Sequence, residues 1–172
     1  MLRRFGIIAV LSLIVAALAA VPALAVPPTE VTQTGGLHVC QGSALDVSPS
    51  KTDAGAILTA TGEVCGAGRT ATAVLEANVE ATVGCVTRGG GEPRGLEEAA
   101  TGTTGEVTIR TRSGRGAFTV ETEPVTIEDF DFECPSAQQR EVIVGPVNFT
   151  DITLTITSQT GQIVATFPDL DP

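Results

Sequence analysis

The chain contains no tryptophan and no tyrosine, and its single histidine is His38. Sandwich proteins that bind carbohydrate stack exposed aromatic rings on sugars, so the absence of both residues weighs against that class. A lone histidine, with no serine in a G-x-S-x-G context, gives no nucleophile, base and orienting acid. We therefore expect a protein that is not an enzyme and needs no cofactor.

Basic residues are also scarce, since 10 Lys and Arg stand against 20 Asp and Glu in 172 residues, for a formal net charge of −10. A polyanionic partner would be repelled by such a surface, which disfavours nucleic acid and anionic membrane faces as ligands. The densest acidic block comprises Glu121, Glu123, Glu128, Asp129, Asp131 and Glu133.

Long apolar runs are absent except at the start, where an apolar stretch from Phe5 to Val21 follows Arg3 and Arg4. Ala23-Leu24-Ala25 then supplies the small-x-small pattern that signal peptidase cuts after. The alternative is an uncleaved anchor, but the run is short of the ~20 residues that span a bilayer. We predict a signal peptide over residues 1–25, cleavage before Val26, and a secreted, extracellular mature protein that leaves the membrane.

Four cysteines follow the predicted cleavage site, at Cys40, Cys65, Cys85 and Cys134. An even number in an oxidising compartment indicates two disulfides, for which three pairings exist. We favour the sequential pairing of residues 40 with 65 and 85 with 134. A zinc site is the alternative, but no C-x-x-C pair is present and one histidine is available.

The clearest structural signal is the strict alternation of apolar and mostly polar residues from Ala71 to Cys85. This period of two is typical of a long, half-buried β-strand, or of two strands separated by a kink. Shorter strand-like runs cover residues 37–40, 56–64, 105–111, 116–121, 125–134, 141–144, 147–157 and 162–167.

The apolar phase changes near Thr150-Asp151, which predicts a β-bulge there, and residues 112–116 and 158–161 carry hairpin-turn residues. No segment shows sustained helical periodicity. We predict an all-β fold, an antiparallel two-sheet β-sandwich of the immunoglobulin-like or a related type, with about seven to nine strands. The sandwich is expected over residues 37–172 as one domain, after a flexible mature N-terminus at 26–36.

The segment from Cys85 to Gly95 is the one loop with individual character, because it is glycine-rich and begins at a predicted disulfide. It could be an exposed binding loop, or simply a mobile connection between strands. Its candidate binding residues are Arg88, Gly89, Gly90, Glu92 and Arg94.

Asp129, Asp131 and Glu133 alternate with Phe130 and Phe132, so the three acids should share one face of a strand. Carboxylates so spaced could share a hard cation, but calcium normally takes six to eight oxygens from a folded-back loop. We therefore expect a solvated acidic face and weak cation binding at most.

Three motifs together resemble a group of small exported bacterial proteins. They are Cys85 with Gly89-Gly90, Pro93 and Gly95; Phe132-Glu-Cys134-Pro135 with Gln138; and Val147-Asn-Phe149-Thr-Asp-Ile152. This chain has Thr87 where the group has Asn, and Arg94 in place of its second proline. The resemblance covers roughly half of the mature chain at motif level and implies an exported β-sandwich with an 85–134 disulfide. It implies no activity.

The sequence thus favours a secreted, non-enzymatic β-sandwich that acts by contact with a protein or a cell surface. The alternative is a secreted proteinase inhibitor, in which the disulfide-rooted loop around Arg88 would enter a protease cleft in extended form.

Overall fold

The computed structural model describes residues 24–52 and 55–171, so the predicted signal peptide lies almost entirely outside the described residues. The described chain consists of strands, loops and one short 3-10 turn, η1 (Ile127–Asp129). The strands are β1 (Glu30–Gly35), β2 (His38–Val39), β3 (Asp46–Thr52), β4 (Gly55–Cys65), β5 (Thr70–Thr87), β6 (Arg94–Arg110), β7 (Arg115–Glu121), β8 (Gln139–Ser158) and β9 (Gly161–Thr166).

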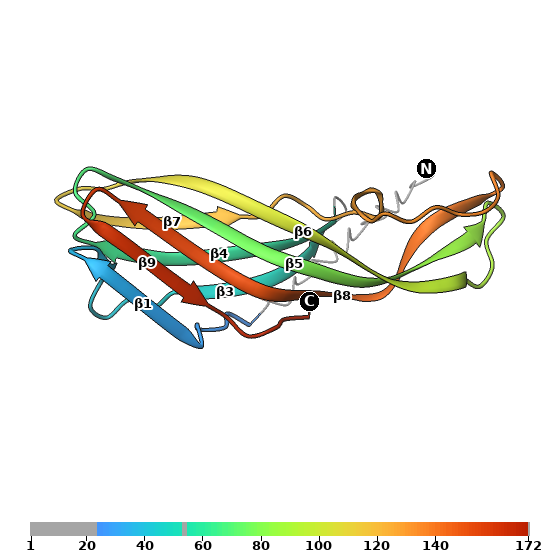
Figure 1. The fold of residues 1–172 in the computed structure, drawn as a ribbon, viewed down its shortest axis with the longest axis horizontal. Coiled ribbons are helices and arrows are strands. Elements are labelled where there is room, and N and C mark those ends of the chain that lie inside the picture. The colour runs from blue at the N-terminus through green and yellow to red at the C-terminus, as the bar shows by residue number, and fades with distance from the viewer. Residues whose placement is uncertain (1–23, 53–54, 172) are drawn as a thin grey trace, which may run out of the picture.

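These strands form two antiparallel sheets, which confirms the predicted β-sandwich and its approximate strand number. One sheet has the order β1-β9-β8-β5-β6. In the other, β4 lies between β7 on one edge and β3 and β2 on the other. Figure 1 shows the two layers stacked in the left half of the molecule, with β4 and β3 behind β5 and β8.

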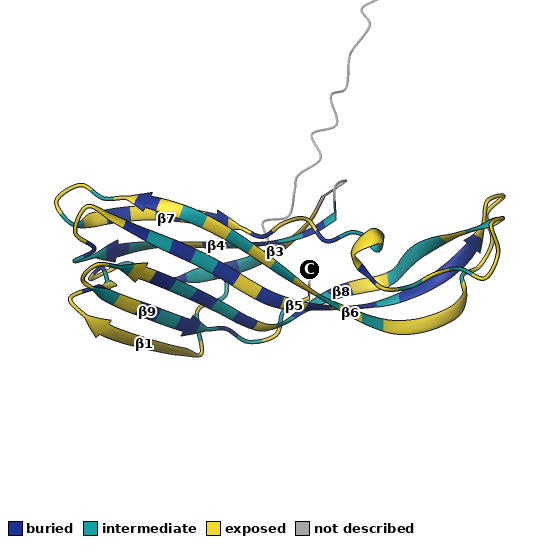
Figure 2. Cartoon of the chain, turned by 45° about the horizontal axis from the view of Figure 1, so that its top comes forward, coloured by how far each residue is buried: buried dark blue, intermediate teal, exposed yellow. Residues whose placement is uncertain are grey.

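The core lies between the sheets and is built from alternate residues of the strands that line it, as the period of two requires. In β5, Leu75 and Val79 are fully buried, whereas Glu76 and Glu80 are exposed. Figure 2 shows the resulting alternation of buried and exposed residues along β5. The predicted inward phase of this strand is therefore correct.

Three strands of the larger sheet are unusually long, because β5, β6 and β8 contain 18, 17 and 20 residues. Their far halves continue beyond the smaller sheet (Figure 1). We call this extension the arm; it comprises residues 77–87, 94–102 and 139–151. One face of the arm is covered by the segment 122–138, from which Phe130 is buried and Ile127 and Phe132 pack against the core.

The turn at residues 112–115 moves the chain from one sheet to the other. Ser113 and Gly114 have φ angles of 54° and 75°, and Arg112 and Arg115 form a single bridge. The predicted turn is present, but β6 then pairs with β5 while β7 pairs with β4. At the opposite end of β7, a Cβ on Gly105 would lie 1.9 Å from the carbonyl oxygen of Glu121, so only glycine permits this crossing of the sheets.

The predicted irregularity near Thr150 is confirmed. Glu76 pairs with Thr153 and Asn78 with Thr150, so β8 holds an extra residue against β5. Asp151 adopts a φ of 50°, and its carboxylate accepts a hydrogen bond of 2.8 Å from the Asn78 side chain. The bulge keeps both Phe149 and Ile152 buried despite the change of phase.

Two expectations about local structure are wrong. Residues 26–36 are not a flexible tail, because β1 pairs with β9 along Glu30–Gly35 and Val26 exchanges two backbone hydrogen bonds with Val47. Residues 125–134 do not form a ladder strand. Exposed and less exposed residues alternate only over 129–134, a capping box at Thr126 starts η1, and the chain then crosses the arm without a partner strand.

Candidate functional site

The far end of the arm gathers the loop that the sequence singled out. Residues 88–93 join β5 to β6 at this tip, and the Arg88 N–H donates a 3.0 Å hydrogen bond to the carbonyl oxygen of Gln138, from the covering segment. The candidate residues Arg88, Gly89, Gly90, Glu92 and Arg94 are all exposed. The structure therefore brings the five together at one end of the molecule.

The tip is a tight turn rather than an extended loop. The Gly90 N–H donates to the Thr87 carbonyl oxygen at 2.9 Å, and the Thr87 hydroxyl donates to the Gly90 carbonyl oxygen. Gly90 and Gly91 have φ angles of 87° and 129°, which suit glycine. Arg88 thus sits inside a hydrogen-bonded turn, whereas a protease cleft binds its substrate or inhibitor in extended conformation.

The disulfide Cys85–Cys134 fixes the base of this tip, and Cys40–Cys65 links β4 to the residue after β2. Both predicted pairings are therefore present, and no described cysteine is free. Two disulfides are characteristic of an oxidising compartment, which agrees with a protein that acts outside the cytosol. No helix in the part of the chain that the structure describes is long and apolar enough to span a membrane.

Next to the second disulfide, Glu141 orders the backbone of the covering segment. Its Oε1 atom accepts a 3.1 Å hydrogen bond from the Cys134 N–H. Hydrogen bonds from the backbone amides of Glu141 itself and of Cys134 lower the pKa of the Glu141 carboxyl. The carboxylate therefore helps to hold the end of the covering segment against β8.

The acidic residues considered for cation binding do different things. Asp129 is occupied by the capping box, where its Oδ2 atom accepts hydrogen bonds from the Thr126 N–H at 2.7 Å and the Thr126 hydroxyl at 3.0 Å. Asp131 and Glu133 are exposed. No group of three metal-ligating side chains converges within residues 24–52 and 55–171.

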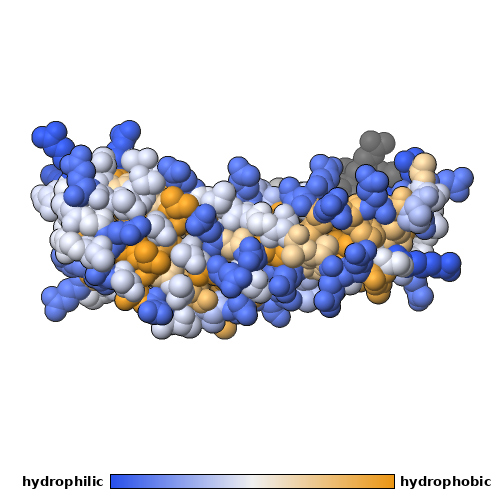
Figure 3. Space-filling view, viewed as in Figure 1, coloured by the Kyte–Doolittle hydropathy of each residue, from blue (hydrophilic) through white to orange (hydrophobic). Residues whose placement is uncertain are grey.

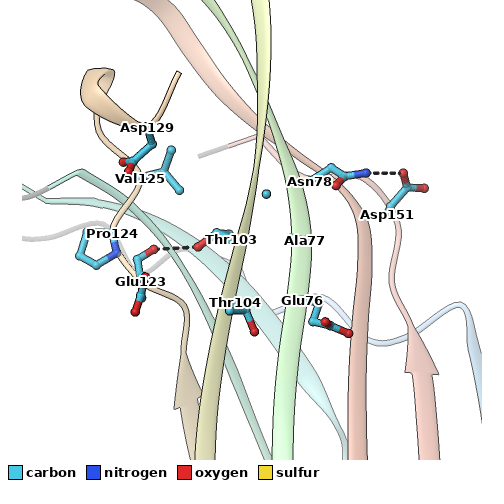
Figure 4. Close-up of a pocket in the computed structure, with 11 residues that line it drawn as sticks. Glu76, Ala77, Asn78, Thr103, Thr104, Glu123, Pro124, Val125, Asp129 and Asp151 are labelled. Carbon is cyan, nitrogen blue, oxygen red and sulfur yellow. Dashed lines mark hydrogen bonds between the residues drawn. The ribbon is translucent and has the colours of Figure 1, made fainter. Parts of the chain in front are cut away.

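A depression of about 390 Å³ lies where the arm leaves the sandwich. Four acids line it, but Figure 4 shows that they belong to different surfaces: Asp151 faces Asn78 on one side of β5, while Glu123 lies by Thr103 on the other. A hydrogen bond of 3.0 Å joins the Thr103 hydroxyl to the Glu123 carbonyl oxygen. This depression is a seam between elements rather than a site with converging carboxylates.

His38 and the serines near it in sequence have separate partners. The His38 Nδ1 atom lies 3.0 Å from the Gly36 carbonyl oxygen, and the Ser43 hydroxyl donates to Glu63 at 2.9 Å. His38 is exposed on the short strand β2. This geometry brings no hydroxyl nucleophile to the imidazole.

One exposed surface was missed at the sequence level, namely the arm section of β6. The strand-like run identified in the sequence begins only at residue 105, and Glu and Ala, which dominate residues 96–102, are poor strand formers. On this strand Leu96 is 57% exposed, one of three large apolar side chains, with Leu24 and Val31, that are exposed in the described chain. The length of β5 was the available signal, because a hairpin around the glycine-rich tip needs a second strand of similar length.

Comparison with protein-family models, with curated proteins and with solved structures finds no match to this chain.

Proposed function

We propose that this protein is exported and acts, without catalysis, by binding another protein or a cell surface through its arm. The arm itself carries the proposal. Three strands continue past the sandwich that they stabilise, and a disulfide and a covering segment hold their far end in one conformation. A rigid scaffold that presents an exposed tip is how many binding loops are displayed.

The composition supports the same proposal. Export by a cleaved signal, two disulfides and an acidic exterior suit a protein that works in an extracellular setting. The negative net charge of the protein favours solubility, and it favours a neutral or basic partner over a polyanion.

Binding of the labelled mature protein to the envelope of the cells that export it tests the proposal. We expect saturable retention that unlabelled protein displaces, and a weaker retention when Arg88 and Arg94 are both replaced by Ala, which removes their contacts without adding negative charge. Replacement of Arg69 by Ala, also exposed but in the loop before β5, is the matched control. Retention that is not saturable, or that the control abolishes equally, would contradict binding through the arm.

The proteinase-inhibitor function keeps one observation in its favour, the exposure of Arg88 at a disulfide-anchored tip. Its test is the residual activity of trypsin-like and subtilisin-like proteases with micromolar protein. Since Arg88 lies in a closed turn, we expect unchanged protease activity and slow cleavage of the loop as a substrate. Tight, stoichiometric inhibition would instead favour the inhibitor function.

A further inference from the structure

The arm section of β6 has an open backbone edge. β6 pairs with β5 over its whole length and ends the order of its sheet. On its other side, the Glu123 N–H donates to the Thr104 carbonyl oxygen at 3.0 Å. Beyond this contact, no strand within residues 24–52 and 55–171 pairs with that edge over residues 96–102.

The direction of the free peptide groups follows from the same contact. The Thr104 carbonyl points away from β5, and backbone groups two residues apart in a strand point the same way. The backbone groups of Glu98, Ala100 and Gly102 therefore also face outward. They form a row of donors and acceptors to which another strand can add.

An open, partly apolar surface lies beside this edge. The Leu96 side chain covers Gly84 so closely that a Cβ atom added at Gly84 would lie 2.8 Å from the Cδ2 atom of Leu96. A depression of about 320 Å³ crosses from β6 over β5 to β8. Its lining consists of Glu80, Ala81, Thr82, Glu98, Ala99, Ala100, Pro146 and Asn148. Figure 3 shows a pale apolar band toward the arm end of this face, bordered by hydrophilic side chains.

The negative charges beside the β6 edge favour a positively charged binding partner. Glu80 pairs with Ala100, and Thr82 pairs with Glu98. Glu80 and Glu98 therefore occupy diagonal positions on one face of the sheet, about 7 Å apart. Glu97 is also exposed on this strand, but its side chain lies on the opposite face of the sheet. A second copy of this acidic chain would bring like charges together, whereas a segment with lysine or arginine would meet opposite charge.

We infer that the free edge of β6 binds an extended, basic segment of a partner protein by strand addition. The backbone of the segment pairs with Glu98, Ala100 and Gly102, its lysine or arginine side chains lie against Glu80 and Glu98, and its small apolar residues cover the alanine floor. This inference rests on the proposed binding function and names the partner's chemistry and the strand that receives it.

The test uses a fluorescent, end-capped peptide that alternates lysine and threonine with valine, and a second peptide with glutamate in place of lysine. The full mature protein should bind the lysine peptide and not the glutamate peptide in fluorescence anisotropy at low salt. Ala100→Pro removes one outward N–H and should weaken binding at least about tenfold. Ala100→Ser keeps the N–H and should bind as the wild type does.

Proline is tolerated on an edge strand when the lost N–H faces solvent, so the variant should keep its fold. The melting temperature of each variant checks this. Hydrogen exchange of the wild type gives an independent readout, since the peptide should slow exchange at the amides of Ala100 and Gly102. Equal affinity of the Ala100→Pro and wild-type proteins, or protection confined to other strands, would overturn the inference.

The two proposals fail differently. Suppose that the Ala100→Pro protein bound the peptide as tightly as the wild type, while the protein was still retained on its native envelope through Arg88 and Arg94. The β6 inference would then fail and the proposed function would stand. If the wild type showed neither retention nor peptide binding, both would fail.

Discussion

Thr122 is the buried polar side chain of the described core, with 4% exposure. Its hydroxyl oxygen accepts a 3.1 Å hydrogen bond from the Leu58 N–H, just beyond the end of β7. Thr122→Val keeps the shape but leaves that buried amide without a partner, so we expect a loss of about 1–3 kcal/mol in unfolding free energy. Urea unfolding measures it. Thr122→Ser retains the hydroxyl and should recover most of the hydrogen-bond contribution; equal losses in both variants would refute this role.

Glu63 joins β4, β7 and the loop before β3 through its carboxylate. Arg115 forms an ion pair with it and donates a second bond of 2.6 Å, and Ser43 donates one of 2.9 Å. The hydrogen bond from Arg115, with that from Ser43, lowers the pKa of Glu63 from 4.5 to about 2.

A lowered folded-state pKa means that this stabilisation is present above pH 4.5 and is lost as the pH falls through about 2. We therefore expect Glu63→Gln to reduce the melting temperature near neutral pH, and the difference from wild type to shrink steadily below pH 4.5. Thermal melts across this range measure it, with Glu121→Gln as an exposed control. A difference that stays constant down to pH 2 would exclude the ionised pair as its cause.

Which residues matter could be predicted only where the signal is local. The number of cysteines predicted two disulfides, the pairing favoured among three possible ones is the one present, and the glycine-rich composition identified the tip. The partners of Glu63 could not be found in this way, because Ser43 and Arg115 are 20 and 52 residues away and meet it only once the sheets pair. Leu96 was missed because the glutamates and alanines around it have a weak preference for β-strands.

At the scale of elements, β5 is the central strand of the arm, with β6 on one side and β8 on the other. Val79 is fully buried, so Val79→Asp would bury an unpaired carboxylate and should cost several kcal/mol, enough to prevent recovery of folded protein. Glu80→Lys, one residue on, should change stability by no more than about 0.5 kcal/mol. The yield and the melting temperature of the purified protein compare the two variants. A silent Val79→Asp would contradict the inward orientation of this face.

Strands with a continuous alternating pattern were predictable, and strands defined by their neighbours were not. β5 and β9 were found almost to their ends, since alternation records a buried and an exposed face. All residues of β1 are exposed, so its sequence shows no alternation of apolar and polar residues. It forms a strand because it pairs with the edge of β9. β3 includes Pro49, a residue that argues against a strand unless it lies at an edge, as β3 does.

For the whole molecule, we expect the two disulfides to have separable effects. Cys85–Cys134 closes a span of 49 residues, for which loop entropy predicts about 4 kcal/mol. Replacing both cysteines by serine should accelerate hydrogen exchange in the arm and covering segment while β4 and β9 remain protected. The same change at Cys40 and Cys65, as the matched comparison, should act in the sandwich. Uniform acceleration in both variants would show that arm and sandwich open as one unit.

The proposed cleavage of a signal peptide would set the start of the mature molecule. Val26 exchanges hydrogen bonds of 2.8 and 2.9 Å with Val47, so cleavage after Ala25 preserves this first bridge of the sandwich. We expect N-terminal sequencing of the secreted protein to begin at Val26. A mature start beyond Val26 would remove the bridge, and an intact Met1 in a membrane fraction would contradict cleavage.

β5 and β8 each run as one strand from the tip to the sandwich, with two register shifts between them, and this course has a mechanical consequence. A pull on the tip along these strands loads their many ladder hydrogen bonds in shear, so that all must yield together. A sideways pull would instead open them one after another, like a zipper. Since Cys134 is covalently tied to β5, part of any tension passes through a covalent strap into the covering segment. We therefore expect the arm to withstand a pull along its strands better than a pull across them.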